Sequence, residues 1–265
     1  MKESLALVVL LGVAAAAGAQ DYVKERLNKS PRHHEWVEVK HGNRVVHCFV
    51  VYPESKEKAT AIIVIHENKG LQDWVRGMAD QLAEAGYIAI APDLLSGMGP
   101  GGTSTKDLKS ADEATMILGK LKPEQVTADL NAVADYILKD KACNGKLVVG
   151  GFCWGGGQTF RFATNRKDLK AAFVFYGMFA HTKEDLAKIL CPVYGFYAGN
   201  DARINESVPA TAAQMKEVGK TFEPVTYPGA GHGFMRAGED PTGSADNRKG
   251  RDQAWERWKG LLKKI

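Results

Sequence analysis

The sequence predicts a single α/β domain with a predominantly parallel sheet, helices on both faces of that sheet and an N-terminal β-hairpin. Short runs of β-branched and apolar residues, typical of strands buried on both faces, alternate with longer segments in which apolar residues recur at helical spacing. No linker, repeat or low-complexity segment divides the 265 residues, and 45% hydrophobic content is ordinary for a globular protein. Strands and helices that alternate in this way form one sheet covered on both sides.

Residues 1–19 are expected to be a secretory signal peptide, cleaved before Gln20. An apolar run over 5–17 ends on Ala17-Gly18-Ala19, which places small residues where a signal peptidase needs them. The alternative is an uncleaved anchor, but the run is shorter than the roughly 20 residues that span a bilayer. We therefore expect an exported protein, periplasmic or secreted, with no stable membrane association after cleavage.

The domain is expected to cover residues 36–265, after a polar lead-in over 20–35. Alternating β-formers on either side of a Gly-Asn turn predict the hairpin, and a glycine is expected to end the first helix. Four glycines and a proline without periodicity predict a loop. The elements expected in this half are strands 36–40, 44–52, 60–65 and 87–91, a helix from about 74 to 85, and a loop over 94–105.

In the second half, proline suits the first turn of a helix that begins at residue 123, and two tryptophans share one stripe of the last helix. The helices expected here are 111–121, 123–139, 156–164, 182–189, 207–218 and 248–264, and the strands are 146–150, 171–176, 192–198 and 221–227.

Composition argues against several classes of partner. The 35 Lys and Arg exceed the 31 Asp and Glu by only four and form no basic block, so nucleic acid is not expected to bind. The four cysteines are too few and too irregularly spaced for a disulfide scaffold, and no C-x-x-C or H-x-x-x-H pair suggests a metal site. Whether two of Cys48, Cys143 and Cys191 pair is left open.

Cys153 is the candidate nucleophile. It stands in Gly151-Phe152-Cys153-Trp154-Gly155, between a predicted strand and a predicted helix, which is a nucleophile elbow with cysteine in place of serine. Such an elbow needs a sharp turn, and glycines let strand and helix approach closely. The start of the following helix favours negative charge on the sulfur. A structural thiol in a glycine-rich turn is the alternative, but no phosphate-loop pattern accompanies it.

Asp201 and His232 are the candidate partners of this cysteine. Each follows a predicted strand, and the chain order nucleophile, acid, histidine is that of α/β-hydrolases. His232 would move the thiol proton, and Asp201 would hold the tautomer and orientation of the imidazole. Either residue could instead belong to an ordinary loop or turn.

A second cluster, His66-Glu67-Asn68-Lys69-Gly70, follows the strand 60–65. In α/β-hydrolases the residue after the nucleophile and a residue of this segment donate the oxyanion-hole N–H groups, which here are those of Trp154 and Asn68. A glutamate at position 67 is less expected in a general hydrolase. Glu67 could have a role in the site, or it could be a surface residue near the start of a helix.

Together these motifs resemble the dienelactone hydrolase (carboxymethylenebutenolidase) family of α/β-hydrolases. The resemblance runs from about residue 36 to 265 and rests on Gly-Phe-Cys-Trp-Gly-Gly at 151–156, His-Glu-Asn-Lys-Gly-Leu at 66–71, Ala-Pro-Asp-Leu at 91–94, Asp201, and Gly-His-Gly-Phe at 231–234. It implies hydrolysis of an ester or lactone through a Cys-His-Asp triad and a thioester, with no cofactor and a small-molecule substrate. It also implies that Glu67 pairs with the resting thiol and helps to activate it.

The sequence departs from the family at one of the two arginines that hold the substrate carboxylate in founding members. Arg236 matches one of them, but Leu95-Ser96-Gly97 stands where the other is expected. Loss of such a contact typically costs about 1.5 to 3 kcal/mol, so the founding dienelactone is not the expected substrate. Lys69 or Arg203 could replace the charge. A general carboxylesterase, another acyl-bond hydrolase or a noncatalytic binding protein are the alternatives, and the oligomeric state is not predicted.

Overall fold

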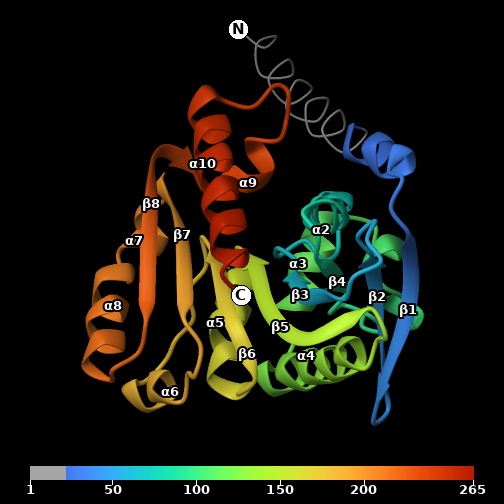
Figure 1. Ribbon diagram of the computed structural model, residues 1–265, viewed down its shortest axis with the longest axis horizontal. Coiled ribbons are helices and arrows are strands. Elements are labelled where there is room, and N and C mark those ends of the chain that lie inside the picture. The colour runs from blue at the N-terminus through green and yellow to red at the C-terminus, as the bar shows by residue number, and fades with distance from the viewer. Residues whose placement is uncertain (1–21) are drawn as a thin grey trace, which may run out of the picture.

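A computed structural model describes residues 22–265, so the expected signal peptide and its cleavage site lie outside the described residues. One sheet of eight strands forms the centre of the molecule, in the order β1-β2-β4-β3-β5-β6-β7-β8 (Figure 1). The first two pairings, β1 with β2 and β2 with β4, are antiparallel, and all the others are parallel. The predicted α/β fold with an N-terminal hairpin is therefore confirmed.

The central strands are buried on both faces, as their continuous apolar sequences predict. All seven residues of β3 are buried, with Ile63 and Ile65 in one apolar cluster and Ile62 and Val64 in the other. The strands are β1 (His34–His41), β2 (Arg44–Val51), β3 (Ala59–Ile65), β4 (Ile88–Pro92), β5 (Cys143–Phe152), β6 (Leu169–Phe175), β7 (Val193–Asn200) and β8 (Phe222–Gly231).

Helices cover both faces of the sheet (Figure 1). The cluster on one face contains residues of α2 and α10, and the cluster on the other contains residues of α4, α5 and α8. The α-helices are α2 (Asp73–Glu84), α3 (Ala111–Leu118), α4 (Pro123–Leu138), α5 (Trp154–Asn165), α6 (Lys183–Ala187), α7 (Ala202–Asn205), α8 (Val208–Glu217), α9 (Phe234–Ala237) and α10 (Ala245–Leu262). Within the described chain, no helix has the length and apolar character needed to cross a membrane.

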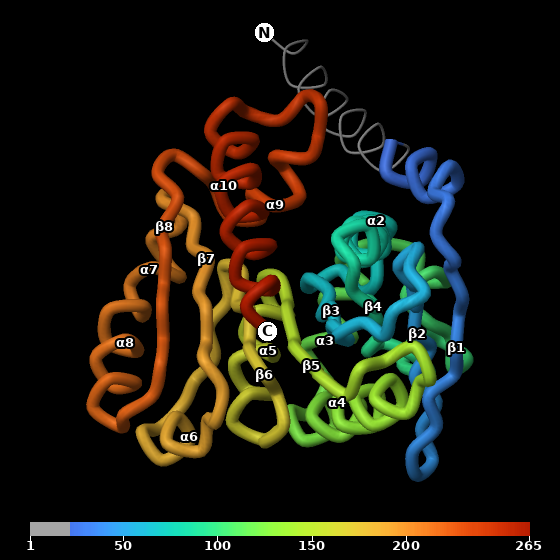
Figure 2. The backbone as a smooth tube through the Cα atoms, viewed as in Figure 1, coloured from blue at the N-terminus to red at the C-terminus, as the bar shows by residue number. Residues whose placement is uncertain are grey.

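The lead-in is more structured than the sequence suggested. Residues 22–29 are helical, and β1 starts at His34, two residues before the expected strand. Val23 and Leu27 are buried and four residues apart, so they share one face of the helix, and the residues between and after them are charged or polar. Figure 2 shows this segment, in blue, beside α2 although some 50 residues separate them in the chain. Two buried apolar residues are too few to show helical periodicity in the sequence, so this helix was not expected.

Three further differences concern short or irregular elements. The loop over 94–105 contains one 3-10 turn, Pro100–Gly102, and a second, Thr105–Asp107, starts at its last residue. The four-residue helices α7 and α9 were not expected. β8 continues to Gly231 beyond the expected end at residue 227, despite Pro228. Proline is tolerated there because β8 lies at the edge of the sheet, where one side of the strand needs no ladder hydrogen bonds.

Candidate active site

Cys153 occupies the turn between β5 and α5 in a backbone conformation that L-residues rarely adopt. Its φ is 55° and its ψ is −117°, and it is the residue immediately before the first turn of α5. Two hydrogen bonds hold the turn: the Cys153 N–H donates to the Phe175 carbonyl at 3.0 Å, and the Gly157 N–H donates to the Cys153 carbonyl at 3.2 Å. The surrounding strand and helix thus fix a strained residue at the carboxyl edge of the sheet.

The glycines on either side of the elbow allow this close approach. A Cβ at Gly151 would lie 2.3 Å from the Gly155 carbonyl oxygen, and a Cβ at Gly155 would lie 2.3 Å from the His66 carbonyl oxygen. Neither distance is possible for a real side chain, and both clashes are with backbone that cannot move aside. The Gly-x-Cys-x-Gly spacing is therefore a steric requirement of this elbow.

Cys153 also differs from the other three cysteines in exposure. All four cysteines are free, and only Cys153 is half-buried, whereas Cys48, Cys143 and Cys191 are buried. Burial raises the pKa of Cys191 to about 11 and raises that of Cys48 still further. A buried thiol that resists ionisation is a poor nucleophile, so Cys153 is the thiol suited to react.

His232 and Asp201 come together at the ends of neighbouring strands. Asp201 follows β7, His232 follows β8, and His232 Nδ1 lies 2.5 Å from Asp201 Oδ2. The aspartate is buried, while about one third of the histidine side chain is exposed. The neighbouring Cys153 sulfur and, to a smaller extent, the Asp201 carboxylate outweigh the effect of burial and raise the pKa of His232 to about 9. The structure therefore places the imidazole between the thiol and a carboxylate.

The two expected oxyanion donors belong to adjacent segments. Trp154 is the first residue of α5, so its N–H is one of those that an α-helix leaves without an internal partner. Asn68 lies in the turn after β3, and its carbonyl accepts a hydrogen bond from the Thr115 hydroxyl at 3.1 Å. The Trp154 indole stacks on the His66 imidazole, with 5.5 Å between ring centres, and so connects the two segments.

His66, which the sequence did not single out, holds this turn in place. Its Nδ1 lies 2.7 Å from the Glu67 carbonyl, and its Nε2 accepts a hydrogen bond from the Leu94 N–H at 3.2 Å. Burial lowers the pKa of His66, so the ring stays neutral and one nitrogen can accept while the other donates. His66 thereby links the segment that carries Glu67 and Asn68 to the start of the glycine-rich loop.

Glu67 is a buried carboxylate rather than a surface acid. Its Oε2 accepts a hydrogen bond from Arg236 Nε at 2.9 Å, and 10% of its side chain is exposed against 46% for Arg236. The Glu67 carboxylate, and more weakly Tyr176 and Cys153, raises the pKa of Arg236. The structure thus joins Glu67 to Arg236, which is the hydrogen-bond partner of the carboxylate.

Tyr176 is a site residue that the sequence analysis missed. It follows β6, has a φ of 39°, and lies edge-on to the His232 ring at 5.2 Å. Its hydroxyl is fully buried without a hydrogen-bond partner at ordinary distance among the described residues. Burial, and then the nearby Glu67 carboxylate, raises the pKa of Tyr176 well above its usual value. A tyrosine at a strand end carries no distinctive motif, so no sequence signal marked it.

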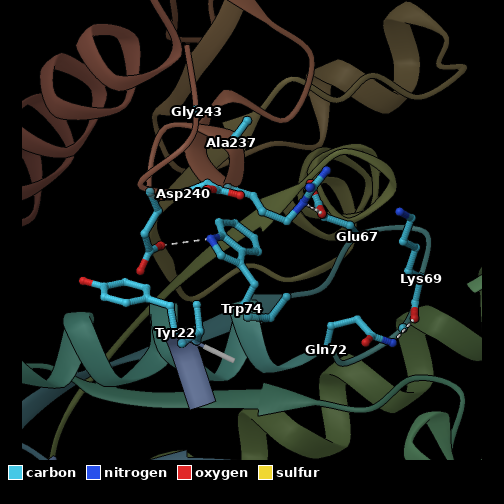
Figure 3. Close-up of a pocket in the computed structure, with 13 residues that line it drawn as sticks. Tyr22, Glu67, Lys69, Gln72, Trp74, Ala237, Asp240 and Gly243 are labelled. Carbon is cyan, nitrogen blue, oxygen red and sulfur yellow. Dashed lines mark hydrogen bonds and ion pairs between the residues drawn. The ribbon is translucent and has the colours of Figure 1, made fainter. Parts of the chain in front are cut away.

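Glu67 and Arg236 both line a cavity of about 260 Å³. Figure 3 shows Glu67, Trp74 and Tyr22 around it. Trp74 and Val75 of α2, Ala237 of α9, and Tyr22 and Val23 of the N-terminal helix supply its apolar lining. Lys69, a candidate to replace the missing arginine, also lines it, whereas the other candidate, Arg203, is exposed on α7 and does not. The cavity is large enough for a compact organic group.

The glycine-rich loop borders a second, larger hollow of about 1030 Å³ that shares Lys69 with the first. Buried Asp93 fixes the end of this loop, because its Oδ1 accepts a hydrogen bond from the Thr105 hydroxyl at 2.7 Å and its Oδ2 accepts one from the Thr105 N–H at 2.9 Å. The loop therefore borders a hollow that adjoins the first cavity at Lys69 and Gln72.

Comparison with known proteins gives matches along most of the chain. The model of the dienelactone hydrolase family matches residues 46–265. A Salmonella typhi protein provisionally named carboxymethylenebutenolidase is 32% identical over 229 residues, covering 79% of each chain. A carboxymethylenebutenolidase homolog of Xenopus tropicalis is 32% identical over 199 residues, covering 74% of this chain and 78% of the homolog. A solved structure from Klebsiella pneumoniae, provisionally described as a dienelactone hydrolase, has the same fold, with a TM-score of 0.77 at 23% identity over 88% of this chain and 99% of that one.

Proposed function

The chain belongs to the dienelactone hydrolase family, and we propose that it cleaves an ester or lactone bond through a Cys153–His232–Asp201 triad. The family implies a hydrolase that acts on a small molecule. The observation that carries the finer proposal is the position of His232, which lies against Asp201 and next to a half-buried thiol at a strained elbow. That arrangement suits nucleophilic catalysis by sulfur.

In the proposed reaction the Cys153 sulfur, its proton held by His232, attacks the carbonyl carbon of the substrate. The C=O bond becomes a C–O⁻ bond, and the N–H groups of Trp154 and Asn68 stabilise the oxyanion. The tetrahedral intermediate collapses to a thioester, and His232 gives its proton to the departing alkoxide. His232 then takes a proton from water, whose oxygen attacks the thioester, and the acid product leaves with the thiol restored.

Asp201 supports both the formation and the hydrolysis of the thioester without itself gaining or losing a proton. Its carboxylate accepts a hydrogen bond from His232 Nδ1, which leaves Nε2 free to face the thiol and the leaving group, and it stabilises the imidazolium. Glu67, expected from the resemblance to pair with the resting thiol and help to activate it, is hydrogen-bonded to Arg236. We propose that this pair forms the charged boundary of the substrate site.

Mass spectrometry of the mature protein after brief incubation with p-nitrophenyl acetate tests the proposal. We expect an acetyl adduct on Cys153 together with release of p-nitrophenol, and loss of both in Cys153→Ala. Cys191→Ala is the matched control, since it removes a free but buried thiol. Turnover that persists in Cys153→Ala would show that another group performs the chemistry. Ligand binding without any turnover, across a panel of esters and lactones, would instead indicate a noncatalytic binding protein.

We also propose that the protein is exported, on the strength of the sequence of residues 1–19. Expression of the full chain in a bacterial host, followed by N-terminal sequencing of the protein released from the periplasm, tests this. A mature N-terminus at Gln20 is the expected result. A protein that keeps Met1 and stays with the membrane fraction would show that the segment is an anchor.

A further inference from the structure

The turn after β3 and the elbow after β5 lie side by side at the carboxyl edge of the sheet. The two strands are parallel neighbours, and Ile65 pairs with Gly151 near their ends. Asn68 and Trp154 are each the third residue after this pair, so the two proposed oxyanion donors belong to adjoining backbone segments. A side chain that contacts both segments can therefore act on both donors.

His66 contacts both segments with one ring. It is fully buried, and its imidazole stacks on the Trp154 indole, with 5.5 Å between ring centres and 16° between ring planes. Its Nδ1 lies 2.7 Å from the Glu67 carbonyl oxygen, which belongs to the same peptide as the Asn68 N–H. The ring therefore lies against the residue that carries the first donor and against the peptide that carries the second.

The hydrogen bonds of His66 determine which ring nitrogen holds the proton. The Leu94 N–H donates to Nε2 at 3.2 Å, so Nε2 presents its lone pair and Nδ1 holds the proton. Burial lowers the pKa of His66, which keeps the ring neutral. The Nδ1–H group is therefore the donor in the contact with the Glu67 carbonyl.

This hydrogen bond fixes the direction of the Asn68 N–H. The peptide between Glu67 and Asn68 is trans, and in a trans peptide the C=O and N–H groups point in opposite directions. The Glu67 carbonyl accepts hydrogen bonds from His66 Nδ1 and, at 3.3 Å, from the Gly70 N–H, so two donors hold one side of the peptide. Within residues 22–265 no acceptor takes a hydrogen bond from the Asn68 N–H, which is therefore available to a substrate oxygen.

We propose that His66 is a positioning residue of the oxyanion hole, whose Nδ1–H holds the Glu67–Asn68 peptide so that the Asn68 N–H faces the oxyanion. This inference rests on the proposed function, because it assumes that a tetrahedral intermediate forms on the Cys153 sulfur. His66 touches no reacting atom in this scheme and acts through the peptide. If the peptide rotated, its carbonyl oxygen would turn toward the developing negative charge, and repulsion would replace a hydrogen bond.

Two substitutions of His66 separate the Nδ1 proton from the rest of the ring. His66→Phe keeps a flat ring that can stack on Trp154, but it has no hydrogen-bond donor. His66→Asn loses the stack, but its amide N–H can lie near the position of Nδ1. Both variants leave the Leu94 N–H without its acceptor, so they differ only in the stacking ring and in the donor to the Glu67 carbonyl.

The measurement compares hydrolysis of p-nitrophenyl acetate with alkylation of Cys153 by iodoacetamide. Hydrolysis passes through an oxyanion, whereas alkylation forms an S–C bond to a saturated carbon and releases iodide, with no oxyanion. In His66→Phe we expect kcat to fall about 10- to 100-fold with KM little changed, and the alkylation rate to stay within about twofold of wild type. His66→Asn should retain most of the wild-type kcat.

His181→Phe is the matched control. The His181 Nδ1 also lies 2.8 Å from a backbone carbonyl, that of Phe179, and its ring also stacks on an aromatic side chain, that of Phe160. His181 lies between β6 and α6 and is not part of the proposed site. His181→Phe should therefore leave both hydrolysis and alkylation at the wild-type rates.

The wild-type protein offers a second test, which does not depend on the activity of a variant. With nitrogen-15-labelled histidine, NMR of the His66 ring nitrogens, assigned by difference from His66→Asn, should show a neutral ring protonated at Nδ1. A ring protonated at Nε2 would overturn the proposal, because it could not donate to the Glu67 carbonyl through Nδ1.

The results that overturn this proposal differ from those that overturn the proposed function. If turnover depends on Cys153 but kcat of His66→Phe stays within about threefold of His181→Phe, the triad stands and the positioning role does not. Equal losses of kcat in His66→Phe and His66→Asn, or a parallel fall in kcat and alkylation rate, would also overturn the role, since the Nδ1 proton would not be the cause. If Cys153→Ala still hydrolyses the ester, the proposed function fails, and the positioning role fails with it.

Discussion

Arg236 Nε donates a hydrogen bond to Glu67 Oε2 at 2.9 Å and so joins the segment after β8 to the segment after β3. The two partners differ in exposure, because the carboxylate side chain is 10% exposed and the guanidinium side chain 46%. A buried charge that loses its partner cannot be solvated, whereas a half-exposed one can. The pair is therefore asymmetric in what each side chain contributes to stability.

This asymmetry gives the first prediction. Arg236→Met leaves Glu67 buried without its counterion and should lower the free energy of unfolding by about 1 to 3 kcal/mol. Glu67→Gln leaves Arg236 able to reach water and should cost less than about 1 kcal/mol. Urea unfolding at pH 7 measures both. Equal losses, or a larger loss in Glu67→Gln, would contradict the asymmetry, and the double variant should recover part of the loss seen in Arg236→Met.

The second prediction concerns pH. The pKa of His232 is raised to about 9, so the imidazolium, which has to protonate the leaving group, is present at neutral pH and is lost as pH rises through about 9. We expect kcat/KM for ester hydrolysis to fall on the alkaline side with a midpoint near pH 9. The same raised pKa stabilises the fold at neutral pH, and this contribution also disappears as pH passes 9.

Alkylation of Cys153 by iodoacetamide separates the nucleophilic reactivity of the thiol from proton donation by His232. The reaction needs the thiolate but no general acid, so its rate should not fall between pH 8 and 10, while hydrolysis declines. A parallel fall in both rates would mean that the alkaline limb reports loss of the folded site rather than of the His232 proton.

The third prediction concerns Asp201. Asp201→Asn removes the charge that accepts the hydrogen bond from His232 Nδ1 and should lower kcat about 10²- to 10⁴-fold, because the imidazole loses its tautomer and orientation. The alkaline midpoint should also move below pH 9, since the carboxylate contributes to the raised pKa of His232. Asp112→Asn, at an exposed position of α3, is the control. A lower kcat with an unmoved midpoint would assign Asp201 a purely structural role.

Sequence alone was sufficient for the parts of the fold that periodicity and turn chemistry determine. Buried strands such as β3 are continuous apolar runs, and the elbow around Cys153 has glycines at the two positions where a Cβ would collide with backbone. Asp201 and His232 could be located because parallel strands bring their carboxyl ends to one edge of the sheet.

Contacts between distant segments could not be predicted in this way. The pairing of Arg26 with Glu239 joins residues 213 positions apart, and neither belongs to a motif. The burial of Tyr176 beside His232 depends on how β6 and β8 are placed, which no local pattern encodes. The N-terminal helix shows only two buried residues, so its role as a cavity wall is a property of tertiary packing.

The fourth prediction tests Lys69 as the replacement for the missing arginine. Its side chain lines the cavity, where an ammonium group can meet a carboxylate on the substrate. Lys69→Met should lower kcat/KM for p-nitrophenyl hemisuccinate about tenfold relative to p-nitrophenyl acetate, and Lys69→Arg should largely preserve the ratio. Equal effects on the charged and the neutral ester would show that Lys69 does not contact the substrate carboxylate.

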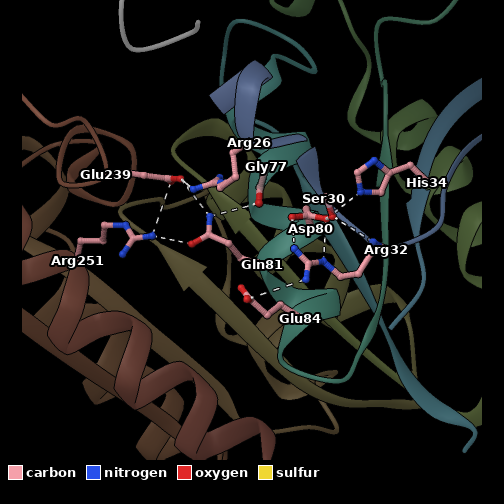
Figure 4. A network of polar contacts seen from close by, with 10 residues as sticks. All are labelled: Arg26, Ser30, Arg32, His34, Gly77, Asp80, Gln81, Glu84, Glu239 and Arg251. Carbon is pink, nitrogen blue, oxygen red and sulfur yellow. Dashed lines mark hydrogen bonds and ion pairs between the residues drawn. The ribbon is translucent and has the colours of Figure 1, made fainter. Parts of the chain in front are cut away.

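The fifth prediction concerns the anchor of the N-terminal segment at Asp80. Burial alone would raise the pKa of this carboxyl, but hydrogen bonds from Arg32, Ser30 and His34 outweigh burial and lower it (Figure 4). Asp80→Asn takes from Arg32, whose side chain is 10% exposed, its close, buried counterion and leaves only the exposed Glu84 at 4.0 Å, so unfolding at pH 7 should become easier by about 3 kcal/mol. Asp252→Asn, a solvent-exposed change on α10, should have no such effect.

The lowered pKa of Asp80 determines how its contribution to the free energy of unfolding changes with pH. Ionised Asp80 stabilises the native state above the pKa of a free aspartate, near 4, and this stabilisation is lost as pH falls through the lower native pKa. Since asparagine mimics the protonated form, the difference in unfolding free energy between wild type and Asp80→Asn should shrink as pH drops below about 4. Urea unfolding from pH 7 to pH 3 measures it, and a difference that stays constant over this range would show that Asp80 acts through packing rather than charge.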